Sequence, residues 1–104
     1  MSVNKIDRAV EDIAIAGFNN IELTGGTRYY EKYQDDILLL KDKYDLKCSI
    51  HNYFPPPIKP FMLNLSSLND DIYNKSIELC KNAILLSKKL GSSYYGVHAG
   101  YLID

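Results

Sequence analysis

The sequence predicts an α/β fold in which three parallel strands alternate with helices in the order αβαβαβ. Segments with apolar residues at helical spacing alternate with short segments in which apolar and polar residues take turns. Each helical segment is about ten residues or longer, a length typical of crossover connections between parallel strands. Apolar residues make up 46% and charged residues 24% of the 104 residues, as in an ordinary globular domain. We therefore expect residues 1–104 to form one domain.

Three helices are expected, each with residues that favour its beginning and its end. The first is capped by Asn4 and ended by Gly17, the second runs from about Tyr30 to Tyr44 and is ended by Asp45, and the third is capped by Asp70 or Asp71 and ended by Gly91. Their core-facing residues are expected to be Ile6, Ala9, Val10, Ile13 and Ala14, then Tyr33, Ile37, Leu40 and Tyr44, then Tyr73, Ile77, Cys80, Ile84 and Leu90.

Three short segments between these helices read as strands: Ile21–Thr24, Leu46–His51 and Ser93–His98. After the second strand, the three prolines of Asn52–Pro57 predict a rigid loop, because proline fits neither a helix interior nor a sheet ladder. Residues 58–68 are expected to be irregular.

Each predicted strand has one apolar face and one small or polar face, because successive side chains point to opposite sides. The apolar sides carry Ile21 and Leu23, Cys48 and Ile50, and Tyr95 and Val97, and the other sides carry Glu22 and Thr24, Ser49 and His51, and Gly96 and His98. A doubly wound sheet is covered by helices on both faces, so its central strands are apolar on both sides. A barrel packs one face against helices and turns the other into the lumen. The pattern therefore favours part of a (β/α)8 barrel.

The two histidines of the chain, His51 and His98, both fall at the carboxyl end of a strand on the predicted lumen face. Imidazole binds zinc, manganese or iron, and its second nitrogen needs an acceptor that fixes the tautomer. Asn52 or a backbone carbonyl would serve as that acceptor. We expect the histidines to bind one divalent metal, although a strand-end histidine also occurs as a hydrogen-bonded structural residue. Glu22 shares this face, as a substrate-binding group or as a satisfied barrel carboxylate.

Two further motifs are weaker. Gly25-Gly26-Thr27 after a strand would offer backbone N–H groups to a phosphate, but a plain turn explains it as well. Tyr53 and Phe54 would form an aromatic wall for a sugar or base, or would pack in the core. The candidate substrate-binding residues are accordingly Glu22, Asn52 and Tyr53.

Charge and composition restrict the partners. Twelve Lys and Arg against thirteen Asp and Glu leave a formal charge of −1, so binding of nucleic acid through a global field is not expected. Cys48 and Cys80 form no CxxC pair and are expected to be reduced thiols, as in a cytoplasmic protein. No apolar run reaches the ~20 residues that span a bilayer, and no secretory leader is recognisable.

Several segments together resemble the first half of a xylose-isomerase-like TIM barrel. They are His51-Asn52-Tyr53-Phe54-Pro55, the run from Pro60 to Ser67, Ser76, Leu90-Gly91 and Val97-His98-Ala99-Gly100. This superfamily contains sugar-phosphate isomerases and epimerases as well as apurinic-site endonucleases. The paired histidines resemble the endonuclease branch, in which they ligate one zinc, whereas Gly17-Phe18 followed by Ile21-Glu22-Leu23 is similar to the isomerase and epimerase branch.

The resemblance implies a role for particular residues. His51 and His98 match metal ligands, for zinc or manganese, Glu22 matches an interior polar position, and Asn64 and Ser76 match positions that support the site. The chain departs from the pattern because it begins with the helix that should follow the first barrel strand. It also ends before the later units that supply the remaining carboxylate and histidine ligands, so the site is expected to be incomplete and no general base can be assigned.

Three functions follow as expectations. The first is a part of a metal-dependent sugar or sugar-phosphate isomerase or epimerase, inactive on its own. The second is a part of a metal-dependent apurinic-site endonuclease. The third is a non-catalytic assembly module that self-associates, because a three-stranded sheet has two open edges.

Overall fold

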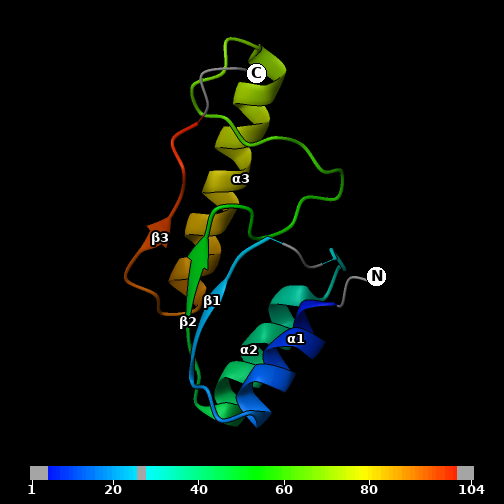
Figure 1. Ribbon diagram of the computed structural model, residues 1–104, viewed down its shortest axis with the longest axis vertical. Helices are drawn as coiled ribbons and strands as arrows, with labels where there is room; N and C mark the ends of the chain where they lie inside the picture. The colour runs from blue at the N-terminus through cyan, green and yellow to red at the C-terminus, as the bar shows by residue number, and fades with distance from the viewer. Residues whose placement is uncertain (1–4, 26–27, 101–104) are drawn as a thin grey trace.

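The computed structural model describes residues 5–25 and 28–100 and shows the predicted order of elements (Figure 1). The elements are α1 (Ile6–Ile15), β1 (Asn20–Leu23), α2 (Tyr33–Tyr44), β2 (Lys47–His51), α3 (Asp70–Lys89) and β3 (Tyr95–Gly96). The strands form one parallel sheet in the order β1-β2-β3, so the predicted α/β fold with three parallel strands is confirmed.

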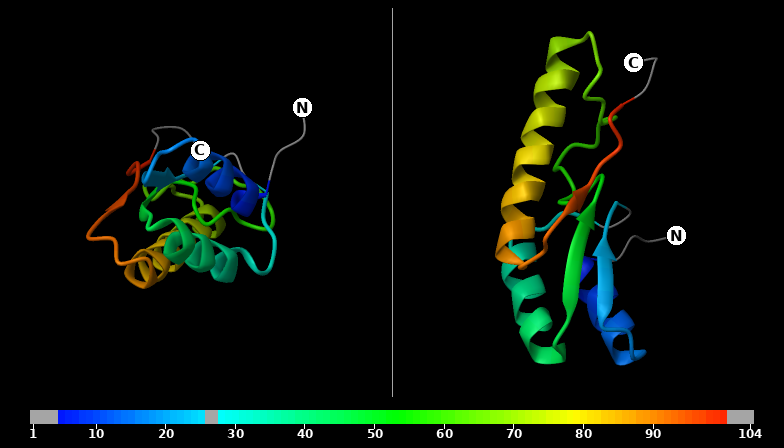
Figure 2. Two further views of the ribbon diagram at one scale, coloured as in Figure 1. Left: turned by 90° about the horizontal axis from the view of Figure 1, so that it is seen from below. Right: turned by 90° about the vertical axis from the view of Figure 1, so that its left-hand side faces the viewer.

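The helices pack on one side of the sheet (Figures 1 and 2). Ile21, Leu23, Cys48 and Ile50 are buried beneath them, whereas Glu22 on the opposite face is exposed. Helix α3 contacts β2 and β3, and α1 packs against α2. One covered and one uncovered face is the arrangement of a barrel wall, and it confirms the inference drawn from strand alternation.

The core lies between this face and the helices. It confirms Tyr33, Ile37 and Leu40 as the inward stripe of α2. Phe54, from the proline loop, is fully buried and packs edge-on against Tyr33, with ring centroids 6.0 Å apart at 84°. Phe54 is therefore a core residue, and the hypothesis that it forms an aromatic wall is wrong.

Helix α3 differs from the prediction in its cap and in its buried face. Its N-cap is Asn69, whose Oδ1 accepts from the Ile72 N–H at 3.2 Å, rather than Asp70 or Asp71. The predicted stripe is wrong at Tyr73 and Ile84, which are 43% and 57% exposed. The residues that face the core instead are Ser76, Leu79, Ala83, Leu86 and Ser87.

Strand β3 is shorter than predicted and pairs with β2 only through Ile50↔Tyr95 and His51↔Gly96. The hydroxyl of Ser92 donates to the Tyr94 carbonyl at 2.8 Å and accepts from the Tyr94 N–H at 3.5 Å. These local bonds engage the Tyr94 backbone, which a sheet ladder would otherwise use. At its other end the strand stops at Gly96, so His98 lies beyond the strand rather than at its last position.

The beginnings of α1 and α2 also differ from the prediction. Lys5 occupies the N-cap of α1 without a side-chain bond, and Asn4, the predicted cap, lies outside the described residues. Helix α2 begins at Tyr33 rather than near Tyr30, with Lys32 as its N-cap. Earlier in this connection, Arg28 forms an isolated parallel bridge with Lys5.

No helix within the described ranges is long and apolar enough to cross a membrane. The two thiols, Cys48 and Cys80, are not bonded to each other.

Candidate metal centre

The site begins with a contact between neighbouring strands. His51, the last residue of β2, lies with its Nδ1 3.0 Å from Oε1 of Glu22 on β1. A carboxylate only accepts, so the imidazole donates through Nδ1–H. This bond leaves Nε2 as the nitrogen that can bind a metal, and carboxylate–histidine pairs of this kind orient metal ligands in many proteins. Glu22, rather than Asn52 or a backbone carbonyl, is the acceptor.

The second histidine lies beside the first. The ring centroids of His51 and His98 are 5.4 Å apart and the rings are inclined at 75°. Metal–nitrogen bonds of about 2.0–2.1 Å place each centroid roughly 3.2 Å from an ion, so two imidazoles at a tetrahedral angle have centroids roughly 5.2 Å apart. The observed separation therefore suits two ligands of one ion.

Two nitrogens do not complete a coordination shell. Within residues 5–25 and 28–100, no group of three or more His, Cys, Asp or Glu side chains comes close enough to hold a metal. The donor chemistry fits zinc or manganese, and the remaining ligands would have to come from outside this part of the chain or from solvent.

Asn52 follows His51 and connects it to the segment that carries His98. Its backbone N–H donates to the Gly96 carbonyl at 2.6 Å, and its Oδ1 accepts from the His98 N–H at 3.3 Å. The Tyr95 hydroxyl donates to the Asn52 carbonyl at 3.2 Å. Sequence reasoning placed Asn52 near the site but missed Tyr95, which reads as a core residue of the strand.

Tyr53 is hydrogen-bonded within the long loop that connects β2 to α3. Its hydroxyl accepts from the Leu63 N–H at 2.9 Å, and a Cβ at Gly25 would lie 3.1 Å from the Tyr53 Cβ. Gly25 therefore lies tightly against the Tyr53 side chain. Gly26 and Thr27, the rest of that predicted turn, lie outside the described residues.

Asn64 and Ser76, the positions that the resemblance marks as supporting, are both buried and bonded to each other. The Asn64 N–H donates to Ser76 Oγ at 2.9 Å, and that hydroxyl donates to the Ile72 carbonyl at 2.7 Å. A Cβ at Gly100 would collide with Asn64 Oδ1. The segment after His98 thus approaches this loop closely, a contact that sequence reasoning missed although Gly100 belongs to the quoted His-Ala-Gly pattern.

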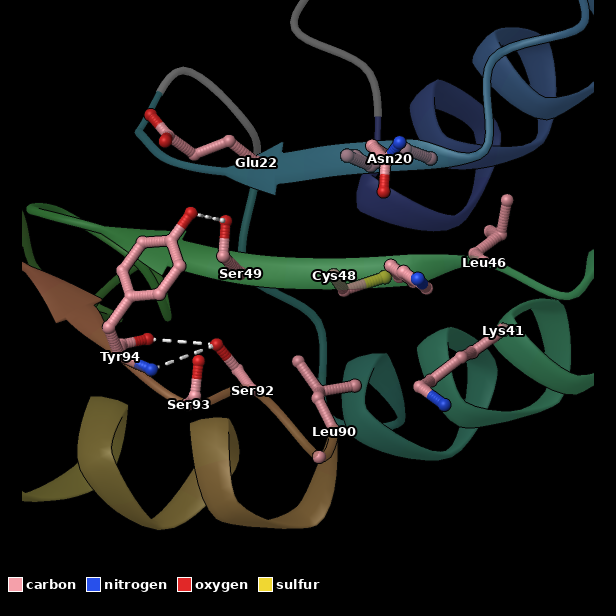
Figure 3. Close-up of a pocket in the computed structure, with 13 residues that line it drawn as sticks. Asn20, Glu22, Lys41, Leu46, Cys48, Ser49, Leu90, Ser92, Ser93 and Tyr94 are labelled. Carbon is pink, nitrogen blue, oxygen red and sulfur yellow. Dashed lines mark hydrogen bonds between the residues drawn. The ribbon is translucent and has the colours of Figure 1, made fainter.

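A cavity of about 540 Å³ lies beside β2, next to the residues that β3 leaves unpaired (Figure 3). Tyr94 points across it, and its hydroxyl donates to Ser49 Oγ at 3.4 Å. Of the predicted site residues only Glu22 lines it. Neither histidine lines the cavity, and Glu22 lies between it and His51.

These features define a class of protein: a barrel-type α/β protein with two histidines at the carboxyl ends of neighbouring parallel strands. The profile of the xylose isomerase-like TIM barrel family matches residues 10–104. The chain belongs to this family.

Curated relatives share a shorter region. The chain is 42% identical over 40 residues to a protein named "Probable endonuclease 4" from Thermotoga maritima. Proteins of the same name from Thermotoga petrophila and Thermotoga sp. (strain RQ2) are 40% identical over 40 residues. In each case the match covers 38% of this chain and 14% of the relative. The match thus spans about a seventh of the length of these relatives.

Proposed function

We propose that His51 and His98 are two ligands of a divalent-metal centre and that the chain is the metal-binding N-terminal part of a phosphodiesterase of the endonuclease 4 type. The observation that carries the proposal is the pair of imidazole rings, whose centroids lie 5.4 Å apart. The ring of His51 is also hydrogen-bonded to Glu22 through Nδ1. The endonuclease name of the curated relatives supports the activity.

Each residue of the proposed centre has a distinct role. The two imidazoles would hold the ion, and Glu22 keeps the His51 ring oriented by accepting from Nδ1. A divalent ion bound there would act as a Lewis acid that polarises a phosphate or carbonyl oxygen and activates water. Asn52 and Tyr53 stay candidates for contacts with a substrate at this mouth of the barrel.

An isomerase or epimerase acting on a sugar or sugar phosphate is the second candidate. It was the first expectation from the sequence, and the pattern Ile21-Glu22-Leu23 and the formal charge of −1 favour it. The curated matches favour the endonuclease, so we place that function first. Because the net charge of this chain is −1, an endonuclease would need basic side chains close to the site to contact DNA.

Titration with zinc tests the metal site. His51→Ala and His98→Ala should each abolish the shift that zinc causes in the imidazole NMR signal of the remaining histidine. Because two ligands form only part of a shell, the affinity of this chain alone is expected to be weak. Unchanged zinc binding in both variants would exclude the site, and submicromolar affinity of the monomer would reveal further ligands.

Incubation with abasic DNA and, separately, with a panel of ketose and aldose phosphates distinguishes the two activities. The assay should use the longest natural gene product that contains this sequence, with the His98→Ala variant as the control for contaminating nuclease. Metal-dependent nicking at the abasic site supports the endonuclease, and interconversion of sugars without nicking would overturn it.

The remaining expectations belong to the same proposal. We propose that residues 1–104 form one incomplete barrel domain, that the protein is cytoplasmic, and that this chain alone has negligible turnover. A role as a non-catalytic assembly module, formed by pairing of the outer strands β1 and β3, is the alternative if neither activity is found.

A further inference from the structure

Asn52 connects the two histidines through three separate bonds. It directly follows His51, and the partners of its backbone N–H, its side-chain oxygen and its backbone carbonyl are Gly96, His98 and Tyr95. All three partners belong to the short segment that carries the second histidine. One residue thus connects the end of β2 to the whole of that segment.

The backbone of Asn52 suits asparagine in particular. Its φ is +50°, a left-handed conformation that most side chains avoid and that asparagine adopts more readily than most. Glycine would accept the same φ but would remove the oxygen that receives the His98 N–H. Aspartate would keep an acceptor, and alanine would lose both properties.

The sheet itself does not fix His98. Pairing between β2 and β3 stops at His51↔Gly96, and His98 is an exposed residue beyond the last pair. The bond from the His98 N–H to the Oδ1 of Asn52, the residue after β2, therefore connects His98 to the end of that strand.

We propose that Asn52 is a positioning residue that sets the spacing between the His51 and His98 rings. The spacing is a property of the metal-free protein. Its consequence, tighter binding of a divalent ion, rests on the function proposed above.

The test compares Asn52→Gly, which keeps the backbone conformation, with Asn52→Asp, which keeps the acceptor. Asp45→Gly is the matched control, because Asp45 has nearly the same φ, +53°, at the end of α2 and away from the histidines. Ring-to-ring nuclear Overhauser contacts between His51 and His98 are measured without metal, and cobalt(II) affinity is then measured by absorption spectroscopy.

Asn52→Gly should lose the contacts between the rings and bind cobalt roughly tenfold to a hundredfold more weakly. Asn52→Asp and Asp45→Gly should retain the contacts. Retention of ring contacts and of cobalt affinity in a folded Asn52→Gly would overturn the proposal. A different result would separate the two proposals. If Asn52→Gly loses the ring contacts but His51→Ala and His98→Ala do not change cobalt binding, the positioning role is upheld and the metal site is refuted.

A measurement on the unaltered protein covers the case in which Asn52→Gly does not fold. The His98 amide hydrogen should exchange with solvent more slowly than the Ala99 amide, because Asn52 Oδ1 accepts it. Equal, fast exchange at both amides would show that the bond does not hold His98, and the proposal would fall.

Discussion

Gly100 lies where two parts of the chain meet too closely for a side chain. A Cβ there would collide with Asn64 Oδ1 and lie 2.9 Å from Ser66 Oγ, and φ is +151°. We expect Gly100→Ala to destabilise the protein by roughly 1–3 kcal/mol, measured by urea denaturation. It should also weaken zinc binding, because the displaced residue follows His98 by two positions.

Gly17 provides the control for backbone conformation alone. Its φ is +100°, and a Cβ there would meet no atom within 4 Å. Gly17→Ala should therefore cost only the backbone penalty of about 1 kcal/mol and leave zinc binding unchanged. Equal losses of stability in Gly17→Ala and Gly100→Ala would show that the contact with Asn64 does not matter.

Tyr30 and Tyr95 are expected to make the stability of the fold fall at alkaline pH. Burial, followed by hydrogen bonds to Asp36 and Cys80 respectively, raises the pKa of Tyr30 and of Tyr95 above the ordinary value of about 10. Above pH ~10 the unfolded chain releases these protons while the folded chain keeps them, so the free energy of unfolding should fall as pH rises. Urea denaturation between pH 8 and 11 measures this slope, and Tyr30→Phe should reduce it. An identical slope in Tyr30→Phe would contradict the assignment.

At the scale of elements, the side chain of Asn69 caps the N-terminus of α3. Asn69 Oδ1 accepts from the Ile72 N–H, one of the helix donors that have no partner within the helix. Asn69→Ala should lower the free energy of unfolding by about 1 kcal/mol, as measured by thermal or urea denaturation. Asn69→Asp keeps a hydrogen-bond acceptor, so its free energy of unfolding should fall much less. No loss in the alanine variant would mean that water replaces the cap.

The order and type of the elements followed from sequence periodicity, but the buried face of α3 did not. Apolar residues occur almost all around this helix, so spacing alone allowed the stripe through Tyr73 and Ile84. Packing instead chose the side with Ser76 and Ala83, both of which are fully buried. Small side chains carry no strong hydrophobic signal, although they permit close approach to the sheet.

The proximity of the candidate site residues was predictable from the sequence, and their detailed contacts were predictable only in part. Strand alternation and the resemblance brought Glu22, His51 and His98 to one mouth of the sheet, and the structure places the first two in contact. The partners of Asn52 and the approach of Gly100 to Asn64 depend on loop conformation after β2 and β3. Such contacts join residues far apart in sequence, and periodicity does not report them.

At the scale of the whole molecule, β1 and β3 are the outer strands of the described sheet. Outer strands present unpaired backbone groups that favour pairing with another chain. We expect the isolated chain to associate as its concentration rises, measured by light scattering. Asn20→Lys, which places a charge on β1, should reduce this association.

Leu68→Lys controls for apolar surface in general, because Leu68 is 95% exposed and lies outside the strands. It should leave the association unchanged. If Leu68→Lys disperses the protein and Asn20→Lys does not, loop surface rather than strand pairing causes the association. A monodisperse monomer at every concentration would exclude both.

Along each strand of the sheet, residues that pack in the core alternate with residues on the uncovered face. In β1 the odd-numbered Ile21 and Leu23 are buried, and in β2 the even-numbered Cys48 and Ile50 are buried. Tolerance to substitution should therefore alternate along each strand with a period of two. The tolerant positions are those on the uncovered face, so substitutions there can change the chemistry of that face at little risk to the fold.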